Sequence, residues 1–117
     1  MGPQDTSSAY LGKPVRVTID RPLGSRNPRH GFLYPINYGF IAGTTSGDAE
    51  ALDAYVVGIA EPLATFEGIC IAMIHRLDDD DDKLVVAPAG ARYGTDEIRR
   101  ATKFQEQYFT SVVILAA

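Results

Sequence analysis

Short apolar runs separated by turn residues restrict the possible folds of this sequence more than any other feature. Residues 15–19 (VRVTI) alternate apolar and polar side chains, which is typical of a half-buried strand. Further strand-like runs occupy residues 32–41, 54–59, 69–76 and 84–88, and the stretches between them are rich in Gly, Pro and polar residues. Five or six short strands bury an apolar face by packing into a sheet that closes, or nearly closes, on itself.

One segment near the C-terminus has helical periodicity instead. Thr95 can cap a helix, and apolar or aromatic residues follow at spacings of three, three and four from Ile98 to Tyr108. This pattern predicts one helix over residues 95–108, and it leaves residues 112–115 (VVIL) open as a final strand or a continuation of the helix. The sequence therefore predicts a mainly β (α+β) domain: a small closed or nearly closed barrel of five or six short strands with one C-terminal helix.

Length and composition describe a single domain. The chain has 117 residues, of which 45% are apolar, and its net charge is -4. We expect residues 1–9 to be a disordered tail and residues 10–117 to form one barrel domain with its own core. No apolar run approaches the roughly 20 residues of a membrane-spanning helix, and the first residues lack the pattern of a secretory signal. We therefore expect a cytoplasmic protein with no membrane partner.

Charge is distributed unevenly along the chain. Residues 1–40 carry five basic and two acidic side chains, residues 41–82 carry one and ten, and residues 83–117 carry five and three. An acidic centre between basic flanks suits a site that collects divalent cations on carboxylates and binds a multiply charged anion with Arg and Lys. Nucleic acid is not the expected partner, because domains that bind it usually present a net basic face. A solvated acidic surface explains the charge block about equally well.

The first acidic group consists of Asp48, Glu50 and Asp53. Residues two apart on an extended segment face the same way, so Asp48 and Glu50 can share a side, and a turn before Asp53 would add the third carboxylate. Three carboxylates on one side repel each other unless a hard cation such as Mg²⁺ lies between them. These residues are candidate metal ligands, with an exposed acidic loop as the alternative.

The second acidic group is the run of five Asp residues at 78–82, which Lys83 follows directly. If the run is extended, alternate members point to opposite faces, so at most about three can face one site. Asp78 or Asp79, together with Asp81, are the candidates for the inward side. An exposed hairpin tip between two strands is the alternative.

Aromatic residues supply a third candidate group. Tyr34 and Tyr38 lie four apart in the aromatic segment, and Tyr108 lies at the end of the predicted helix. A phenol can donate a hydrogen bond to a phosphate oxygen without adding charge, although core packing explains Tyr residues at least as often. His30 and His75 have no second His or Cys at zinc spacing, so a zinc site is not expected.

Several of these segments together resemble the soluble, magnesium-dependent (type I) inorganic pyrophosphatase family. Residues 34–41 (YPINYGFI) resemble its Tyr-Pro-x-Asn-Tyr-Gly-x-Ile segment, and residues 47–58 (GDAEALDAYVVG) resemble its Asp-Gly-Asp-Pro-x-Asp-Val-Leu-Val signature. Residues 78–88 (DDDDDKLVVAP) resemble its second acidic stretch, and residues 104–109 (FQEQYF) resemble a helix segment whose Tyr contacts phosphate. The resemblance covers about residues 15–113. It implies a five-stranded barrel of the oligonucleotide-binding (OB-like) type, Mg²⁺ as cofactor, and a homo-oligomer.

The resemblance also implies roles for individual residues. Asp53 is the preferred residue for orienting the attacking water, and Glu50 is the second choice. The implied metal ligands are Asp48, Glu50, Asp53, Asp78, Asp79 and Asp81. The implied substrate-binding residues are Arg26, Lys83, Tyr38 and Tyr108.

The chain resembles a short, divergent branch of that family. Residues 21–31 stand where the family has a hairpin that bears a Lys and a Glu, Asp20 resembles the family's early Glu, and Phe109 replaces a Lys. The resemblance implies hydrolysis of inorganic pyrophosphate to two orthophosphates by water activated on Mg²⁺. The alternatives are hydrolysis of another phosphoanhydride, a non-catalytic barrel that binds metal and phosphate, and a purely structural subunit.

Overall fold

The structure, a computed structural model, describes residues 7–44, 51–78 and 81–117. Three of the predicted metal ligands, Asp48, Glu50 and Asp79, lie outside these residues. The described elements, in chain order, are η1 (Ser7–Tyr10), β1 (Pro14–Arg21), β2 (Asn37–Ile41), β3 (Leu52–Val56), β4 (Thr65–Arg76), β5 (Lys83–Ala87), α1 (Thr95–Glu106) and β6 (Ser111–Leu115). Residues 7–9, which the sequence assigns to a tail, belong to the short 3₁₀ helix η1.

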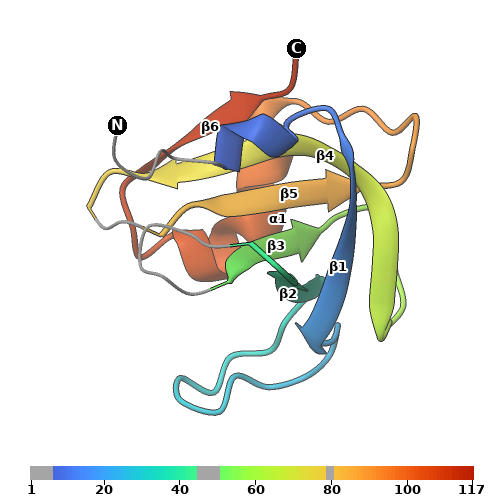
Figure 1. Cartoon of the computed structure of the whole chain (residues 1–117). Coiled ribbons are helices and arrows are strands. Elements are labelled where there is room, and N and C mark those ends of the chain that lie inside the picture. The colour runs from blue at the N-terminus through green and yellow to red at the C-terminus, as the bar shows by residue number, and fades with distance from the viewer. Residues whose placement is uncertain (1–6, 45–50, 79–80) are drawn as a thin grey trace.

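Five of the strands form a closed barrel (Figure 1). The sheet order is β1-β2-β3-β5-β4-β6, and an additional pairing between β1 and β4 closes the first five strands on themselves. The β3–β5 pair is parallel and the other pairs are antiparallel. The predicted mainly β, OB-like barrel with one late helix is therefore confirmed. The sixth strand, β6, lengthens the sheet on the free edge of β4.

Several element boundaries differ from the sequence prediction. The aromatic segment 32–41 is a strand only from Asn37, because Pro35 lacks the N–H group that a sheet ladder needs. Residues 112–115 lie in β6 rather than in a longer helix. Helix α1 ends at Glu106, and its N-cap is Gly94 rather than Thr95. The backbone N–H of Gly94 donates to Oε1 of Glu97 at 2.8 Å, which satisfies one of the free groups of the first turn.

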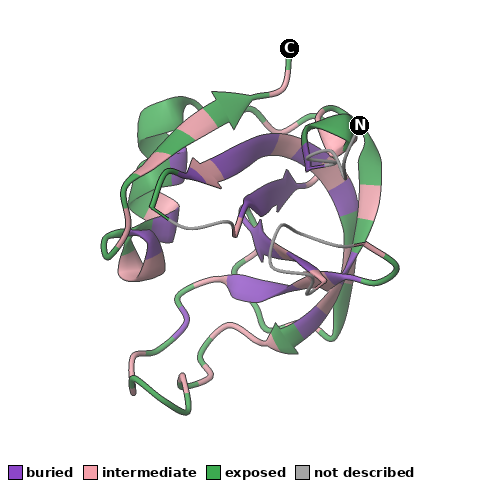
Figure 2. Cartoon of the chain, turned by 60° about the vertical axis from the view of Figure 1, so that its left-hand side comes forward, coloured by how far each residue is buried: buried purple, intermediate pink, exposed green. Residues whose placement is uncertain are grey.

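Two apolar clusters lie on opposite faces of the barrel strands. One fills the barrel and includes Leu52 and Leu84, which are fully buried. The other lies between the barrel and α1 and includes Tyr55 and Ile98. Figure 2 shows buried residues on successive strands around the barrel and on the inward side of the helix. A fully buried Leu or Ile contributes about 1.5–3 kcal/mol, so Ile98 is one of the residues that attach α1 to the barrel.

A β-bulge interrupts the pairing of β1 with β2. Ile19 pairs with Gly39 and Arg21 pairs with Tyr38, so Asp20 is an extra residue without a partner on β2. Bulges redirect a side chain and are common near functional sites. Gly39 is required beside the bulge, because a Cβ there would collide with the carbonyl oxygen of Thr18.

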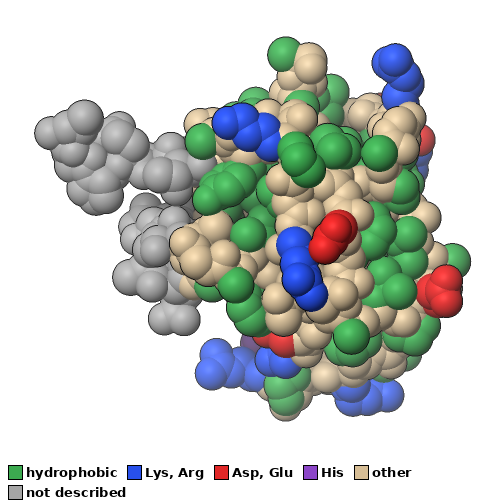
Figure 3. Space-filling view, turned by 45° about the vertical axis from the view of Figure 1, so that its right-hand side comes forward, with side chains coloured by type: hydrophobic (Ala, Val, Ile, Leu, Met, Phe, Trp, Pro, Cys, Tyr) green, Lys and Arg blue, Asp and Glu red, His purple; other side chains and the backbone are tan. Residues whose placement is uncertain are grey.

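The surface mixes apolar and charged side chains. On the face that Figure 3 shows, Lys and Arg side chains are scattered and do not form one basic stripe. Among the helices in the described part of the chain, none has the length and apolar character needed to cross a membrane.

Candidate active site

Lys83 joins two carboxylates at one end of the barrel. It is the first residue of β5 and lies beside Asp53 in the parallel register with β3. Its Nζ donates to Oδ2 of Asp53 at 2.6 Å and to Oδ2 of Asp81 at 2.7 Å. The two acidic stretches therefore converge on one ammonium group, although Asp53 lies 30 residues from Lys83 in the chain. We call Asp53, Asp81, Lys83 and the neighbouring Tyr38 the Lys83 cluster.

Burial and neighbouring charges change the pKa values of Lys83 and Tyr38. Burial alone lowers the pKa of Lys83, whose side chain is only 4% exposed, but Tyr38, Asp53 and Asp81 raise that pKa by more, so the group stays charged. The ring centroid of Tyr38 lies 5.7 Å from the Lys83 Nζ. Burial raises the pKa of the Tyr38 phenol, which Lys83 partly offsets, so Tyr38 is a neutral hydrogen-bond donor at physiological pH.

Asp20 adds a further carboxyl group near the cluster. The side chain lies at the surface on the β1 bulge, and its pKa is raised above the ordinary value. Partial burial of the carboxyl is the largest cause, Arg21 opposes it, and the negative charge of Asp53 adds to it.

A second charged group lies in the interior, between β4 and α1. Arg76 donates from Nε to Oε1 of Glu106 at 3.1 Å and from NH2 to Oε2 at 2.7 Å. The Tyr55 hydroxyl donates to Oε2 of Glu106 at 2.6 Å and accepts from Nε2 of Gln105 at 2.8 Å. Burial and the Glu106 carboxylate raise the pKa of Tyr55, which keeps this donor protonated. We call these four residues the Arg76–Glu106 network.

Sequence reasoning missed this network. Arg76 is the last residue of an apolar strand and Glu106 lies within a helix, and neither position indicates its partner 30 residues away. The sequence offers one weak signal, which is that Glu106 is the one acidic residue of the FQEQYF segment. The structure buries this residue.

Three other predicted site residues are not seen in contact with the Lys83 cluster. Oδ2 of Asp78 accepts from the backbone N–H of Thr110 at 3.1 Å, in the connection before β6. Arg26 donates from NH1 to the carbonyl of Gly31 at 2.6 Å, inside its own loop. Tyr108 follows the end of α1 and is 70% exposed.

The aromatic segment positions the cluster through Asn37. The Oδ1 atom of this fully buried residue accepts from the backbone N–H groups of Leu23 at 2.9 Å and Leu63 at 3.1 Å, and its Nδ2 donates to the carbonyl of Glu61 at 2.8 Å. One side chain thus attaches two loops to the start of β2 and fixes the strand that carries Tyr38.

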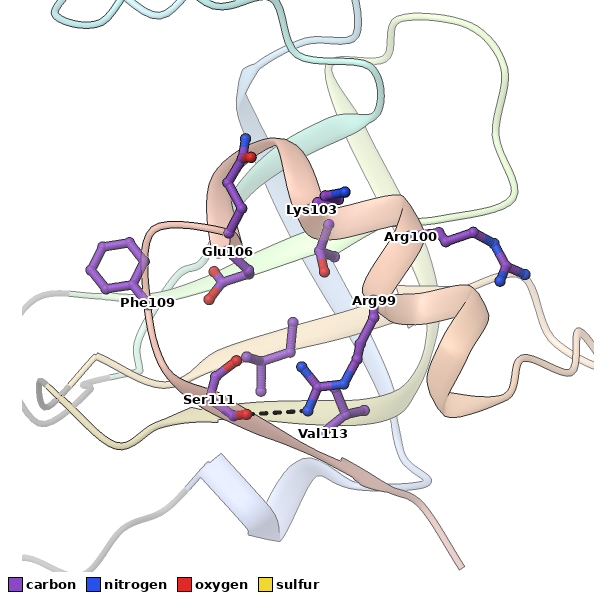
Figure 4. Close-up of a pocket in the computed structure, with 10 residues that line it drawn as sticks. Arg99, Arg100, Lys103, Glu106, Phe109, Ser111 and Val113 are labelled. Atoms are coloured by element: carbon purple, nitrogen blue, oxygen red, sulfur yellow. Dashed lines mark hydrogen bonds between the residues drawn. The ribbon is translucent and has the colours of Figure 1, made fainter.

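A groove of about 310 Å³ lies between α1 and β6 (Figure 4). Arg99 crosses it and donates from NH2 to the carbonyl of Ser111 at 3.1 Å. Glu106 and Phe109 line one end, whereas no residue of the Lys83 cluster lines it. The groove therefore meets the Arg76–Glu106 network only at Glu106 and is separate from the Lys83 cluster.

The described residues of the cluster fit a hard divalent cation by their chemistry. Across residues 7–44, 51–78 and 81–117, no group of three or more His, Cys, Asp or Glu side chains is arranged to hold a metal ion. Asp53 and Asp81 nevertheless bring carboxylate oxygens to one place. Mg²⁺ is commonly held by one or two protein carboxylates together with water and substrate phosphate.

Comparison with known proteins gives a consistent result. The family model described as inorganic pyrophosphatase matches residues 14–113. A curated protein named inorganic pyrophosphatase from Aeropyrum pernix is 34% identical over 77 residues, covering 62% of this chain and 40% of the relative. One of the same name from Neisseria meningitidis is 33% identical over 86 residues, covering 69% of this chain and 48% of the relative. The chain thus spans less than half the length of these two relatives.

Solved structures extend the likeness to the fold. The inorganic pyrophosphatase of Ehrlichia chaffeensis superposes with a TM-score of 0.70 at 17% identity, covering 91% of this chain and 88% of that one. That of Helicobacter pylori superposes with a TM-score of 0.63 at 16% identity, covering 91% and 84%. At this level of identity the likeness establishes a shared fold.

Proposed function

Because the chain belongs to the inorganic pyrophosphatase family, we propose that it hydrolyses inorganic pyrophosphate to two orthophosphates at the Lys83 cluster. The observation that carries this proposal is the convergence of Asp53 and Asp81, from separate acidic stretches, on the ammonium group of Lys83. A site of this kind combines carboxylates for a cation with a permanent positive charge for an anion.

The charge of the cluster accounts for the need for a divalent cation. Two carboxylates and one ammonium group leave a net charge of -1, which by itself repels a multiply charged phosphate compound. We propose Mg²⁺ as the cofactor, held by Asp53 and Asp81, with Asp48, Glu50, Asp78 and Asp79 as further ligands that the sequence suggests. Bound there, Mg²⁺ supplies positive charge to the phosphate oxygens and lowers the pKa of a water molecule in its coordination shell.

The remaining steps belong to residues of this chain. Asp53 accepts a hydrogen bond from the attacking water and orients it toward phosphorus, with Glu50 as the second candidate. Lys83, held in place by two carboxylates, stabilises charge on the phosphate oxygens as the bridging bond breaks. Tyr38 adds a neutral donor. Arg26 and Tyr108 are proposed to contact substrate from their exposed positions.

Substitution of Asp53 tests this proposal. Asp53→Asn keeps the size of the side chain but removes the charge that accepts from water and holds a cation, so Mg²⁺-dependent orthophosphate release should fall by at least about 10²-fold. The measurement is orthophosphate release from a panel of phosphoanhydrides that includes pyrophosphate. Asp82→Asn is the matched control, because Asp82 bonds to His75 instead of Lys83. Wild-type turnover in the Asp53 variant would remove this residue from the mechanism, and metal binding without any turnover would indicate a binding module.

Assembly and compartment are further parts of the proposal. Val112, Ile114 and Leu115 of β6 are exposed, and an apolar strand at the edge of a sheet favours association with another copy. We therefore propose a homo-oligomer that uses no nucleic-acid or membrane partner. The cytoplasm is the proposed compartment, on the basis of the sequence pattern.

A further inference from the structure

The guanidinium of Arg76 is fixed on several sides. Two of its nitrogens form a fork with the two oxygens of Glu106, at 3.1 and 2.7 Å. The ring centroid of Phe109 lies 3.6 Å from its Cζ atom. Only 5% of the Arg76 side chain is exposed. A planar fork held in this way is more rigid than a Lys at the same position.

The partner of Arg76 is itself held in place. Oε2 of Glu106 also accepts from the Tyr55 hydroxyl at 2.6 Å, and that hydroxyl accepts from Gln105 at 2.8 Å. Figure 4 shows Glu106 at the C-terminal end of α1, with Phe109 on the chain that leaves the helix. The position of Arg76 thus depends on the end of α1.

Arg76 also faces the candidate active site. Its NH1 lies 3.6 Å from Oδ2 of Asp81, the oxygen that accepts from Lys83 at 2.7 Å. Lys83 in turn contacts Asp53 at 2.6 Å. Charges of alternating sign therefore run from Glu106 through Arg76, Asp81 and Lys83 to Asp53, and connect the end of the helix to the site.

We propose that Arg76 is a positioning residue that holds the Asp81 carboxylate where it can bind a divalent cation, and that the end of α1 sets this position through Glu106. The proposal rests on the function proposed above, because it assigns a cation to the same carboxylate. Arg76 is too buried to contact substrate, so it acts on the site through its contact with Asp81.

The variant that tests this removes both buried charges together. Arg76→Met alone would leave Glu106 buried without its cation, and a loss of folding would hide the effect on the site. The double variant Arg76→Met with Glu106→Gln keeps an acceptor for Tyr55 and removes the pair as a unit. Circular dichroism and urea unfolding establish that it folds. If it does not, Arg76→Lys carries the test, because it keeps the charge and loses the fork.

The readout is the affinity for Mg²⁺ alone, measured by calorimetry on folded protein, with kcat and KM for pyrophosphate beside it. Loss of a group that orients a metal ligand typically weakens metal binding by 10-fold or more, so we expect about a 10-fold weaker Kd, a lower kcat and a KM changed by less than about twofold. A purely structural pair would leave the affinity of the folded protein unchanged.

The control is His75→Gln, which removes the neighbouring contact between His75 Nδ1 and Asp82 Oδ1 at 2.8 Å and leaves Arg76 and Asp81 in place. Its Mg²⁺ affinity should equal that of wild type. Wild-type affinity in the double variant, or no Mg²⁺ binding by wild type, overturns the positioning role. Weaker Mg²⁺ binding by the variant supports it even if wild type releases no orthophosphate, an outcome that would refute the proposed hydrolysis alone.

Discussion

The Lys83 cluster and the Arg76–Glu106 network are both built from opposite charges, but they differ in burial. The side chains of Asp53 and Asp81 are 31% and 21% exposed, whereas those of Arg76 and Glu106 are 5% and 7% exposed. Water, a cation or an anion can therefore reach the carboxylates of the cluster. The network is closed to solvent, and its carboxylate is held by Arg76 and Tyr55. Ion pairs thus form an accessible candidate ligand site in the Lys83 cluster and a buried, fixed contact in the Arg76–Glu106 network.

The largest expected difference between the two regions is the loss of unfolding free energy when one charged side chain is removed. Glu106→Leu should lower the free energy of unfolding by about 3–5 kcal/mol, because it leaves Arg76 buried without its main partner. Lys83→Met is the matched variant in the cluster, and it should cost only about 1–2 kcal/mol, since water can hydrate the partly exposed carboxylates of Asp53 and Asp81. Urea unfolding of both variants measures the difference. Equal losses would contradict the distinction between a closed and an accessible group.

The pH dependence of stability gives a smaller effect at the rim of the cluster. The pKa of Asp20 is raised in the folded protein, so folding favours its protonated form. Its contribution to stability is therefore complete below pH about 3.9, the unfolded value, and is lost as pH rises through the higher folded value. Asp20→Asn should remove this loss, so the free energy of unfolding should change less as pH rises above about 3.9. The difference from wild type should be less than about 1 kcal/mol, because the side chain is exposed. Urea midpoints between pH 3 and 7 test this, and an unchanged profile would contradict a raised pKa of Asp20 in the folded protein.

The sequence predicts the fold better than it predicts the support of the site. Alternation in residues 15–19 and the spacing from Ile98 to Tyr108 depend on local geometry, so strands and helix follow from neighbours in the chain. Asp53 and Lys83 are predicted because Asp53 belongs to one acidic group and Lys83 directly follows the other, and because both segments resemble acidic stretches of the family. Their contact depends on the parallel pairing of β3 with β5, which periodicity does not specify.

The Arg76–Glu106 network and the Asp20 bulge are tertiary features of a different kind. A buried ion pair places charged residues where the pattern of burial predicts apolar ones, and in the sequence Arg76 is simply the last residue of the strand-like run 69–76. The bulge depends on one extra residue in β1 and on Gly39 opposite it, and nothing near Asp20 in the chain indicates that register. Both features appear only once the strands are assembled.

A double-mutant cycle on Asp53→Asn and Asp81→Asn tests most directly whether the two acidic stretches form one site. The quantity to measure is kcat/KM for Mg²⁺-dependent orthophosphate release from pyrophosphate in wild type, both single variants and the double variant. If the two carboxylates serve one cation beside Lys83, the double variant should be no more than about threefold less active than the weaker single variant, because residues that act as a unit are not additive. Losses that multiply, as for two independent sites, would contradict the account.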